Sequence, residues 1–503
     1  MHLKVCFFLV LVLLLGPARL PLRGQPAPES VKYVFLFIGD GMSTPQRELG
    51  EQYALACTGQ GLKMNNLPVN TLTTTRSANQ EVTDSAASGT AIACGQKTNN
   101  LSLGVDPEGK PLDSIAKLAL RHGRRVGIVS SVTLNHATPG AFYATVPSRS
   151  MYYEIGLDMI ESGFHYFAGG GLQAHDNQES PRYRGNLYEL AAQAGYVVCK
   201  EDAAAFRSLS PDPAAKVMVF AQAGALPYEL TAPSGALTLL DLTRKGIELL
   251  DNPGGFFLMV EGGLIDYAAH GNQTELMLGE MLGLDRCISA ALDFARQHPE
   301  DTLIVVTGDH ETGGLTLSAS AQQDQSEWQK VRGQQQLADA FEAKIRQIIA
   351  QPDTTLDTVL ALVEADFGLP GGLTAAERQQ IELSFQLERQ RAEYQRQSTA
   401  LEQDFAARKL GRPNAEIPLL EQEFSAAQAK LAAEHKKLLQ KFPRLSLTRQ
   451  VTVICNQRRG ISWKTGGHSS LPVQTSASGK HSERFREATD NCCIARILTS
   501  LLQ

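Results

Sequence analysis

The chain of 503 residues is 43% hydrophobic and 20% charged, values that are typical of a folded globular protein and exclude a disordered one. This length has room for one large domain or for two or three ordinary ones. The formal net charge of -6 argues against a nucleic acid as the main partner. It also means that an anionic substrate would have to be attracted by local cations rather than by the whole surface.

The N-terminus has the pattern of a secretory signal. Lys4 precedes an apolar run, residues 5–15, that ends before Gly16 and Pro17. A run of about 11 apolar residues is too short to span a bilayer. We therefore expect residues 1–24 to be a signal peptide and the protein to be exported to the periplasm or the extracellular space, with a short membrane anchor as the alternative. No later segment predicts a transmembrane helix. Of the eight cysteines, Cys6 lies in the predicted signal peptide, and the sequence does not give the disulfide pairing of the others.

Between residues 25 and 320, short apolar strands alternate with helical segments. Near-continuous apolar runs of this kind are typical of strands buried on both faces, and the alternation is typical of βαβ units. We predict an α/β core with a largely parallel central sheet flanked by helices. The predicted strands are 34–38, 125–131, 196–199, 256–260 and 302–306, and the clearest predicted helices are 112–122, 186–194 and 275–297.

The composition changes in residues 321–447, which are rich in Gln, Glu, Ala, Lys and Leu. The pattern predicts two long amphipathic helices, Ala375–Arg408 and Leu419–Lys441, joined through Gly411–Asn414. We expect a helical hairpin inserted into the core, which could be a lid, a dimer contact or a structural insertion alone. The core would resume over 448–503 with a strand at Gln450–Cys455 and a Gly-rich loop at Trp463–Ser470.

Acidic side chains follow three of the predicted strands. Asp40 comes after the first strand, Glu261 ends the strand 256–260, and Asp309 with His310 follows the strand 302–306. The carboxyl ends of parallel strands meet at one edge of a sheet, so we expect these groups to converge on one crevice. Several unpaired carboxylates in one place repel one another strongly, which makes cations their natural partners. The sequence therefore predicts a metal site.

Two further signals are weaker on their own. Asp266 and His270 are four residues apart and share one face of a helix, as two ligands of one zinc ion often do. Ser85 follows Thr83 and Asp84, which could cap a helix and place Ser85 in its first turn, where N–H groups favour an anion. Ser85 could equally be part of the cap alone. As a nucleophile it would need a metal ion to form an alkoxide, because no histidine base is evident.

Taken together, these segments closely resemble the alkaline phosphatases in residue type, order and spacing. The resemblance covers most of residues 31–318 and resumes at roughly 450–503, which leaves the helical insertion outside it. It implies hydrolysis of small phosphate monoesters through a phosphoserine, on a site with two zinc ions and one magnesium ion. It also makes a homodimer one possibility.

The resemblance implies a role for each candidate residue. Ser85 would be the nucleophile, and Arg149, in Val-Pro-Ser-Arg, would hold the phosphate with Asp84 orienting it. The metal ligands that it implies form three groups, which are Asp40, Asp309 and His310 for the zinc beside Ser85, Asp266, His270 and His468 for the second zinc, and Asp40, Glu261 and Thr138 for magnesium, with His136 close to that ion.

Two positions leave details of the chemistry open. His136 stands where some bacterial members of the family carry an aspartate, so the third site could prefer another metal or hold magnesium more loosely. Tyr267 occupies a position beside the phosphate that varies within the family, which leaves the leaving-group preference open.

Three rival functions can be weighed against the same residues. A sulfatase needs Cys/Ser-x-Pro-x-Arg, whereas Ala-Ala-Ser follows Ser85. A phosphodiesterase of the same superfamily usually lacks the third metal site, for which Glu261 and Thr138 are both present. A metal- or phosphate-binding protein without activity is the alternative from another class, and the complete set of ligands argues against it.

Overall fold

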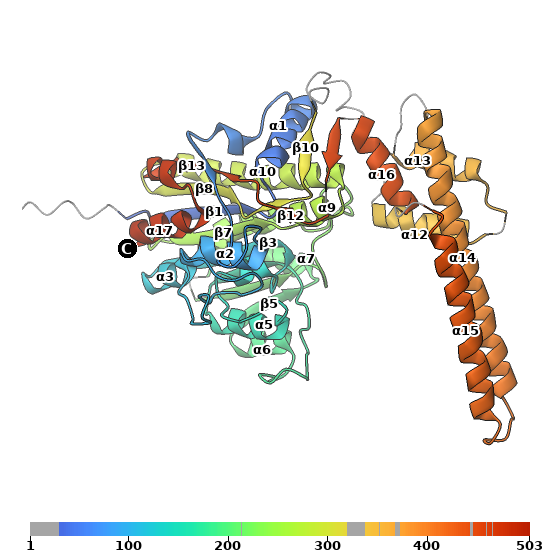
Figure 1. The fold of residues 1–503 in the computed structure, drawn as a ribbon. Coiled ribbons are helices and arrows are strands. Elements are labelled where there is room, and N and C mark those ends of the chain that lie inside the picture. The colour runs from blue at the N-terminus through green and yellow to red at the C-terminus, as the bar shows by residue number, and fades with distance from the viewer. Residues whose placement is uncertain are drawn as a thin grey trace, which may run out of the picture.

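The computed structural model describes residues 30–212, 214–318, 338–351, 353–367, 373–442, 446–458, 460–464 and 466–503. The predicted signal peptide lies outside the described residues. An α/β core carries a separate group of helices that projects away from it (Figure 1). Within the described ranges no helix combines the length and the apolar character that crossing a membrane requires.

The core is built on one nine-stranded sheet with the strand order β2-β13-β8-β1-β7-β3-β4-β6-β5. All neighbouring strands pair in parallel except β13, which runs antiparallel to both of its neighbours, β2 and β8. This confirms the predicted fold class. The strands are β1 (Tyr33–Gly39), β2 (Val69–Thr73), β3 (Arg125–Thr133), β4 (Tyr166–Gly170), β5 (Tyr196–Lys200), β6 (Lys216–Phe220), β7 (Phe256–Gly262), β8 (Thr302–Gly308) and β13 (Val473–Gly479).

Helices cover both faces of the sheet, because the side chains of its central strands are mostly apolar and are buried on both faces. One face packs against α2 (Ser85–Cys94), α3 (Ile115–Arg121), α5 (Tyr152–Glu161), α6 (Leu187–Gln193) and α17 (Asn491–Leu502). The other packs against α1 (Thr44–Thr58), α7 (Ala203–Ser208), α8 (Leu239–Leu250), α9 (Leu264–His270) and α10 (Thr274–Gln297). The single-turn helix α4 (Ala137–Gly140) follows β3.

The three central strands end at the same level. In β1, β7 and β8 every residue is buried, and the register places Gly39 opposite both Gly262 and Gly308. A side chain at Gly308 would meet the carbonyl oxygen of Met42 at 2.1 Å, so glycine is needed there for the loop after β1 to cross the end of β8. The residues that follow these strands are thereby brought to one edge of the sheet.

The helical insertion has its own hydrophobic core. It comprises α12 (Ala338–Ile349), α13 (Leu356–Phe367), α14 (Ala375–Lys409), α15 (Ile417–Leu439) and α16 (Leu447–Arg458). The predicted strand Gln450–Cys455 is wrong, because these residues lie in α16. There Val451, Ile454 and Cys455 follow a helical spacing and pack with Phe341 and Phe385. The hydrophobic core of the insertion thus includes side chains of α16.

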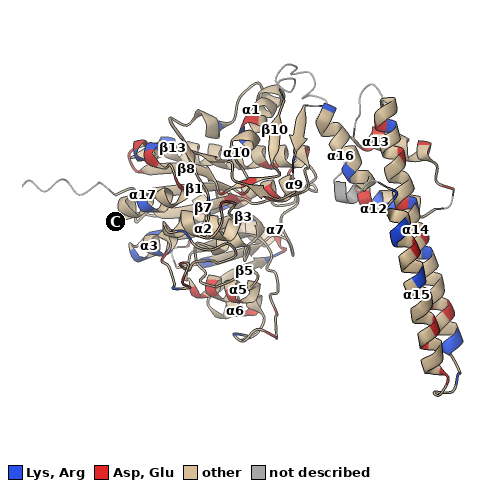
Figure 2. Cartoon of the chain, viewed as in Figure 1, with Lys and Arg blue, Asp and Glu red and all other residues tan. Residues whose placement is uncertain are grey.

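The two long helices α14 and α15 form the predicted antiparallel hairpin and project from the rest of the molecule (Figure 1). Stacked rings hold them together, with Tyr394 against His435 and Phe405 against Phe424. Their exposed surfaces carry acidic and basic residues interspersed along both helices (Figure 2). Apart from Leu420, no described residue of α15 is fully buried, so its amphipathic stripe is covered only in part.

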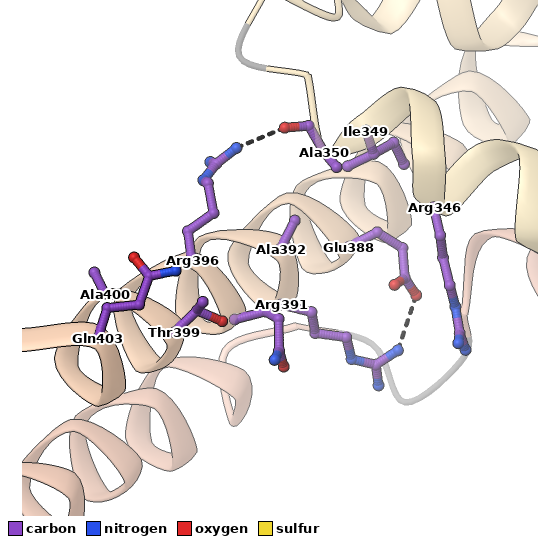
Figure 3. A pocket seen from close by; sticks show the side chains of 11 residues that line it. Arg346, Ile349, Ala350, Glu388, Arg391, Ala392, Arg396, Thr399, Ala400 and Gln403 are labelled. Atoms are coloured by element: carbon purple, nitrogen blue, oxygen red, sulfur yellow. Dashed lines mark hydrogen bonds and ion pairs between the residues drawn. The ribbon is translucent and has the colours of Figure 1, made fainter. Parts of the chain in front are cut away.

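A cavity of about 740 Å³ lies in the insertion between α12 and α14 (Figure 3). It shares no lining residue with the edge of the sheet described above. Its three arginines already contact other groups of the insertion, with Arg346 bound to Glu342, Arg391 to Glu388, and Arg396 to both Glu393 and the carbonyl oxygen of Ala350.

Two short antiparallel ribbons connect the insertion to the core, and together we call them the neck. The chain leaves the core through β9 (Glu311–Thr312) and β10 (Leu315–Leu317) and returns through β11 (Ile461–Trp463) and β12 (His468–Ser469). β10 pairs with β11, and β9 pairs with β12. The Gly-rich segment predicted at Trp463–Ser470 therefore contains short strands as well as loop.

Candidate active site

Three carboxylates meet at the edge of the sheet where β1, β7 and β8 end. Asp40 directly follows β1, Glu261 is the penultimate residue of β7, and Asp309 directly follows β8. All three side chains are fully buried. The parallel register that aligns the ends of the strands explains why residues so far apart in sequence come together. We use the name strand-end site for these three carboxylates together with Asp266, His136, His270, His310 and His468.

Several polar atoms of the strand-end site make no hydrogen bond. They are Asp40 Oδ1, His136 Nδ1, Glu261 Oε1 and Asp309 Oδ2, all of them buried. Burial, reinforced by Asp309 and the other nearby acids, raises the pKa of Asp40 well above its usual range. Burial also raises the pKa of Glu261 to about 8 and that of Asp309 to about 7. Burying several acids together lowers the stability of the fold unless a cation binds them, and several of their oxygen atoms make no hydrogen bond. Both features fit a cation-binding site.

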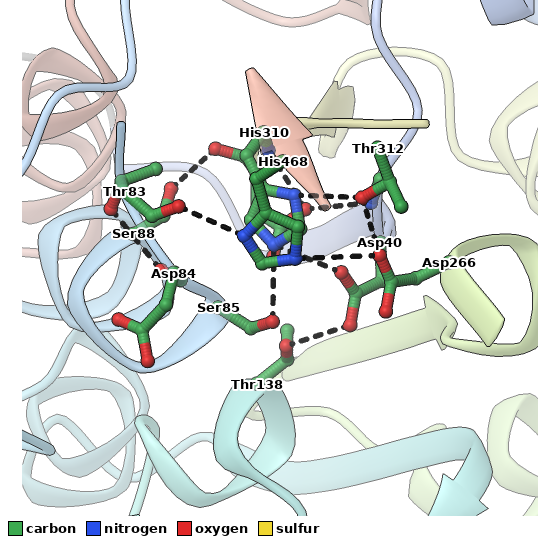
Figure 4. Close-up of polar contacts among 12 residues, drawn as sticks. Asp40, Thr83, Asp84, Ser85, Ser88, Thr138, Asp266, His310, Thr312 and His468 are labelled. Atoms are coloured by element: carbon green, nitrogen blue, oxygen red, sulfur yellow. Dashed lines mark hydrogen bonds and ion pairs between the residues drawn. The ribbon is translucent and has the colours of Figure 1, made fainter. Parts of the chain in front are cut away.

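The first cluster of possible metal ligands contains Asp40, Asp309 and His310, whose ligand atoms all lie within 4.8 Å of one another. His310 Nε2 is 3.3 Å from Asp40 Oδ1 and 3.5 Å from Asp309 Oδ2. The same nitrogen is 3.1 Å from Ser85 Oγ, so this cluster lies directly beside the predicted nucleophile. Figure 4 shows Ser85 from α2, Asp40 from the end of β1 and His310 from the loop after β8 gathered at this point.

The second cluster is built around Asp266 in α9. His270 Nε2 is 3.3 Å from Asp266 Oδ2, and His468 Nε2 is 3.8 Å from Asp266 Oδ1 and 3.2 Å from His270 Nε2. The hydrogen bond to Asp266 raises the pKa of His270 to about 9, and against the effect of burial it lowers the pKa of Asp266. The structure therefore brings His468 back to the site from beyond the insertion (Figure 4).

The third cluster joins Asp40 to Glu261 and His136, again with ligand atoms within 4.8 Å of one another. Thr138 Oγ1 donates to Asp40 Oδ2 at 3.4 Å, which places this hydroxyl in the same group. Ser130 Oγ donates to Glu261 Oε2 at 2.5 Å and holds that carboxylate in place. Asp40 thus belongs to both the first cluster and the third, as a ligand shared by two ions would.

Ser85 begins α2, and Asp84 caps this helix by accepting from Ala87 N at 3.0 Å. Small residues fill the helix, which lets it pack closely at the sheet edge. Arg149 extends over the same end of the helix, with Nη1 3.1 Å from Asp84 Oδ2 and Nη2 3.0 Å from His136 Nε2. Burial, followed by the charge of Arg149, lowers the pKa of His136 to about 3, so this histidine is neutral and can accept from the guanidinium.

Tyr267 stands at the rim of this site. It is 37% exposed, and its ring meets His136 edge-on with centroids 5.9 Å apart. Tyr267 therefore combines a contact with His136 and partial exposure to solvent.

Every residue predicted for the site lies in this arrangement, but four contributing side chains were not predicted. Ser130 binds Glu261, Thr312 Oγ1 donates to Asp266 Oδ1 at 2.5 Å, and Ser88 Oγ donates to the carbonyl oxygen of Asp309 at 2.6 Å. The fourth, Glu311, receives hydrogen bonds from four donors. Glu311 and Thr312 follow the predicted ligands Asp309 and His310 in sequence, whereas Ser130 and Ser88 do not adjoin a predicted ligand. Nothing in residue type alone separates these positions from ordinary polar neighbours.

Comparison with known proteins agrees with this geometry. The family model described as "Alkaline phosphatase" matches residues 31–503. Alkaline phosphatase 3 of Bacillus subtilis is 26% identical, with 94% of this chain and 90% of the relative covered. Alkaline phosphatase 4 of the same organism is 33% identical over 58% of this chain, and the match covers only 64% of that relative.

Among solved structures, a cold-active alkaline phosphatase from a psychrophilic Shewanella species is 27% identical and superposes with a TM-score of 0.70. That match covers 94% of this chain and all of the other. The sequence match over nearly the whole described chain and the shared fold agree with each other. The chain therefore belongs to the alkaline phosphatase family.

Proposed function

We propose that this protein hydrolyses phosphate monoesters to an alcohol and inorganic phosphate, through a phosphoserine at Ser85. The observation that carries the proposal is the set of three neighbouring clusters of carboxylates and histidines, two of which share Asp40 and one of which lies 3.1 Å from the Ser85 hydroxyl. Membership of the alkaline phosphatase family supports it.

The side chains of the strand-end site fit the metal set that we propose, two zinc ions and one magnesium ion. Histidine and carboxylate mixtures suit zinc, while the carboxylate and hydroxyl oxygens near Glu261 suit magnesium. The buried oxygen atoms of Asp40, Glu261 and Asp309 that make no hydrogen bond are the strongest sign of a fit, because a cation would use them. We propose Asp40, Asp309 and His310 for one zinc, Asp266, His270 and His468 for the other, and Asp40, Glu261 and Thr138 for magnesium, with His136 beside it.

When bound, such ions act as Lewis acids that favour the ionised serine and stabilise charge on the attacking and leaving oxygens. The residues of the chain would supply the rest. Ser85 Oγ attacks phosphorus, the bond to the alcohol oxygen breaks, and the alcohol leaves with a proton. Water then attacks the phosphoserine, the bond between phosphorus and Ser85 Oγ breaks, and phosphate leaves as the serine regains its proton. Both steps transfer the phosphoryl group at one place in the site.

Arg149 and the first turn of α2 would hold the phosphoryl group during both steps. Asp84 and His136 fix the guanidinium on its two sides, at 3.1 and 3.0 Å, so its planar fork is oriented before substrate arrives. The N–H groups at the start of α2 add the positive end of a helix dipole near the same oxygens. Preorganised donors of this kind stabilise the developing charge without rearrangement.

The third cluster favours a monoesterase over a diesterase, because Glu261 and Thr138 are both in position beside Asp40. The segment after Ser85 does not have the sulfatase pattern. Export and a homodimer remain predictions.

One assay separates these possibilities. Wild-type protein supplied with zinc and magnesium should hydrolyse p-nitrophenyl phosphate far faster than bis(p-nitrophenyl) phosphate or p-nitrophenyl sulfate. Dialysis against a chelator should abolish the activity, and adding zinc and magnesium should restore it. A preference for the diester or the sulfate would contradict the proposal, and so would full activity after the metals have been removed.

A further inference from the structure

Glu311 is a fully buried carboxylate at the start of the neck, next to the strand-end site. Four donors surround it. Oε1 accepts from Gln46 Nε2 at 2.8 Å and from the backbone N–H of Leu315 at 3.1 Å. Oε2 accepts from Ser469 Oγ at 2.5 Å and from the backbone N–H of Gly314 at 3.1 Å. Both carboxylate oxygens are therefore satisfied without water.

The two backbone donors show why a carboxylate is needed here. One N–H, from Leu315, points at Oε1, and the other, from Gly314, points at Oε2. A glutamine in the same place would turn its own NH₂ group toward one of these donors and leave it without an acceptor. An ionised carboxylate accepts on both sides and replaces the water that burial removes. Glu311 therefore holds together a turn and two side chains that no neutral residue of its shape could hold equally well.

One of these side chains belongs to the strand that carries His468. Ser469 is the next residue in β12, and it stands directly opposite Glu311 in the pairing of β9 with β12. Glu311 and Ser469 are 158 residues apart in sequence, and the whole insertion lies between them. The strand β12 itself contributes only two residues to its ladder, so the ladder alone holds it weakly.

Gln46, the other side chain bonded to Glu311, links this carboxylate to α1 and to the loop after β1. Gln46 Nε2 donates both to Glu311 and to the carbonyl oxygen of Thr312 at 2.8 Å, and Gln46 Oε1 accepts from Ser43 Oγ at 2.6 Å. Thr312 in turn donates to Asp266. The contacts of Glu311 thus join α1, β9 and β12, and all of them are buried or partly buried.

We propose that Glu311 is a positioning residue for the second zinc ion. Through Ser469 it anchors β12 to the core, so that His468 stays beside Asp266 and His270 whatever the helical insertion does. The inference rests on the proposed function, since it concerns a ligand of the same metal site. Groups that orient a metal ligand typically change metal affinity by about 10–100-fold when they are removed.

The test is metal binding by the full-length protein. Ser469→Ala removes the hydroxyl that reaches Glu311 and leaves both the carboxylate and the metal ligands in place. Titration of zinc against a competing chromophoric chelator should give two stepwise affinities in the wild type. In Ser469→Ala we expect the affinity of one step to fall by about tenfold or more and that of the other to stay within about twofold, the weakened step being the zinc site of Asp266, His270 and His468. Crystals grown at limiting zinc should then show the retained ion beside Asp40 and Asp309.

Two matched variants separate positioning from a general effect on the neck. Ser469→Thr keeps the hydroxyl and should keep both affinities. Ser462→Ala removes an exposed hydroxyl from the same neck, in β11, and should also bind both ions as the wild type does. Wild-type affinity at both sites in Ser469→Ala would overturn the inference, and so would an equal loss at the two sites.

The outcome can be separated from that of the proposed function. A wild type that binds two zinc ions but hydrolyses no monoester would refute the function, while the site-selective loss of zinc in Ser469→Ala would still support the role of Glu311. A wild type that binds no zinc would overturn both. Glu311→Gln adds a second measurement, because the loss of one acceptor should weaken the same zinc step at least as much as Ser469→Ala does.

Discussion

The core and the hairpin of the insertion use the same charged residue types in opposite ways. In the hairpin, Arg408 bonds to Glu423 at 2.7 Å and Lys409 to Glu421 at 2.9 Å, with all four side chains roughly half exposed. Water and an opposite charge satisfy each of these groups, and such pairs contribute about 0–1 kcal/mol. At the strand-end site the acids are fully buried and several of their atoms have no hydrogen bond.

This contrast between exposed charge pairs and buried acids indicates which charged residues of the protein are functional. A surface charge pair costs little and therefore needs no explanation beyond solubility. A group of buried, incompletely bonded carboxylates lowers the stability of the metal-free fold, so its presence indicates something that binds there. The cavity between α12 and α14 is large, but its arginines are already bonded within the insertion. Volume alone is thus a poorer guide than the state of the charges.

The largest effect should come from removing the proposed nucleophile of the strand-end site, a change with no counterpart in the hairpin. Ser85→Ala should lower kcat by about three orders of magnitude, because the covalent step is lost. It should keep its zinc, since the ligands come from other residues. Ser88→Ala, in the same helix and bonded to the carbonyl oxygen of Asp309, is the matched control and should lose less activity. Near-normal turnover in Ser85→Ala would rule out the phosphoserine.

A buried acid outside the strand-end site sharpens the comparison. Glu280 in α10 accepts from the backbone N–H of Glu229, and burial raises its pKa to about 8. Because the folded pKa lies above the ordinary value, the protonated acid stabilises the fold at low pH, and this stability is lost as the pH rises through about 8. The free energy of unfolding of Glu280→Gln, relative to that of the wild type, should therefore rise with pH. The rise should be at most about 1.4 kcal/mol per pH unit between roughly pH 5 and 8.

Denaturant unfolding at several pH values would measure this effect. The same substitution at the exposed Glu300, Glu300→Gln, provides the matched control. A Glu280→Gln variant whose advantage did not grow with pH would mean that the acid is ionised in the folded protein without cost.

A smaller effect is expected from shortening the hairpin. Removing all of Ala375–Lys441 would take Ile381 and Phe385 out of the insertion's core, so a cut beyond the Tyr394–His435 stack is cleaner. Replacing residues 398–431 with a short glycine linker should leave zinc content and hydrolysis of small monoesters close to wild-type values. Measurement of mass in solution would show in parallel whether the distal hairpin holds a dimer together. Loss of zinc in a folded, shortened protein would place a ligand in the hairpin.

The smallest effect should come from a single charge of the hairpin. Arg408→Ala removes the bonds to Glu423 and Asp404 and should leave the free energy of unfolding close to that of the wild type, because water replaces both partners. Thermal unfolding of the variant and the wild type, at low and high salt, would measure it. A loss of several kcal/mol would show that the hairpin charges are not equivalent to ordinary surface pairs.

The parallel sheet and the acids at its strand ends could be predicted from local patterns, whereas His468, Thr138 and Arg149 entered only through the family resemblance. Apolar runs such as Val34–Ile38 end in residues whose chemistry is unusual for a strand end. The long helices of the insertion were also predicted to within a few residues, since their periodicity extends over many turns. These signals need no knowledge of distant contacts.

The failures have a physical reason too. Residues 450–455 are β-branched enough to suggest a strand, but packing against α12 and α14 makes them helical, and tertiary contacts override a weak propensity. The roles of Glu311 and Ser130 depend on which side chains the fold places opposite them, which no local pattern contains. Helices α12 and α13 carry less regular patterns and were not predicted individually.

The most direct test of the central claim is where zinc binds. Crystals of the wild type grown with zinc, measured at the zinc absorption edge, should show two anomalous peaks in the strand-end site. We expect one bounded by Asp40, Asp309 and His310 and the other by Asp266, His270 and His468. Zinc found only elsewhere on the protein, or these side chains left without any ion at saturating zinc, would contradict the account.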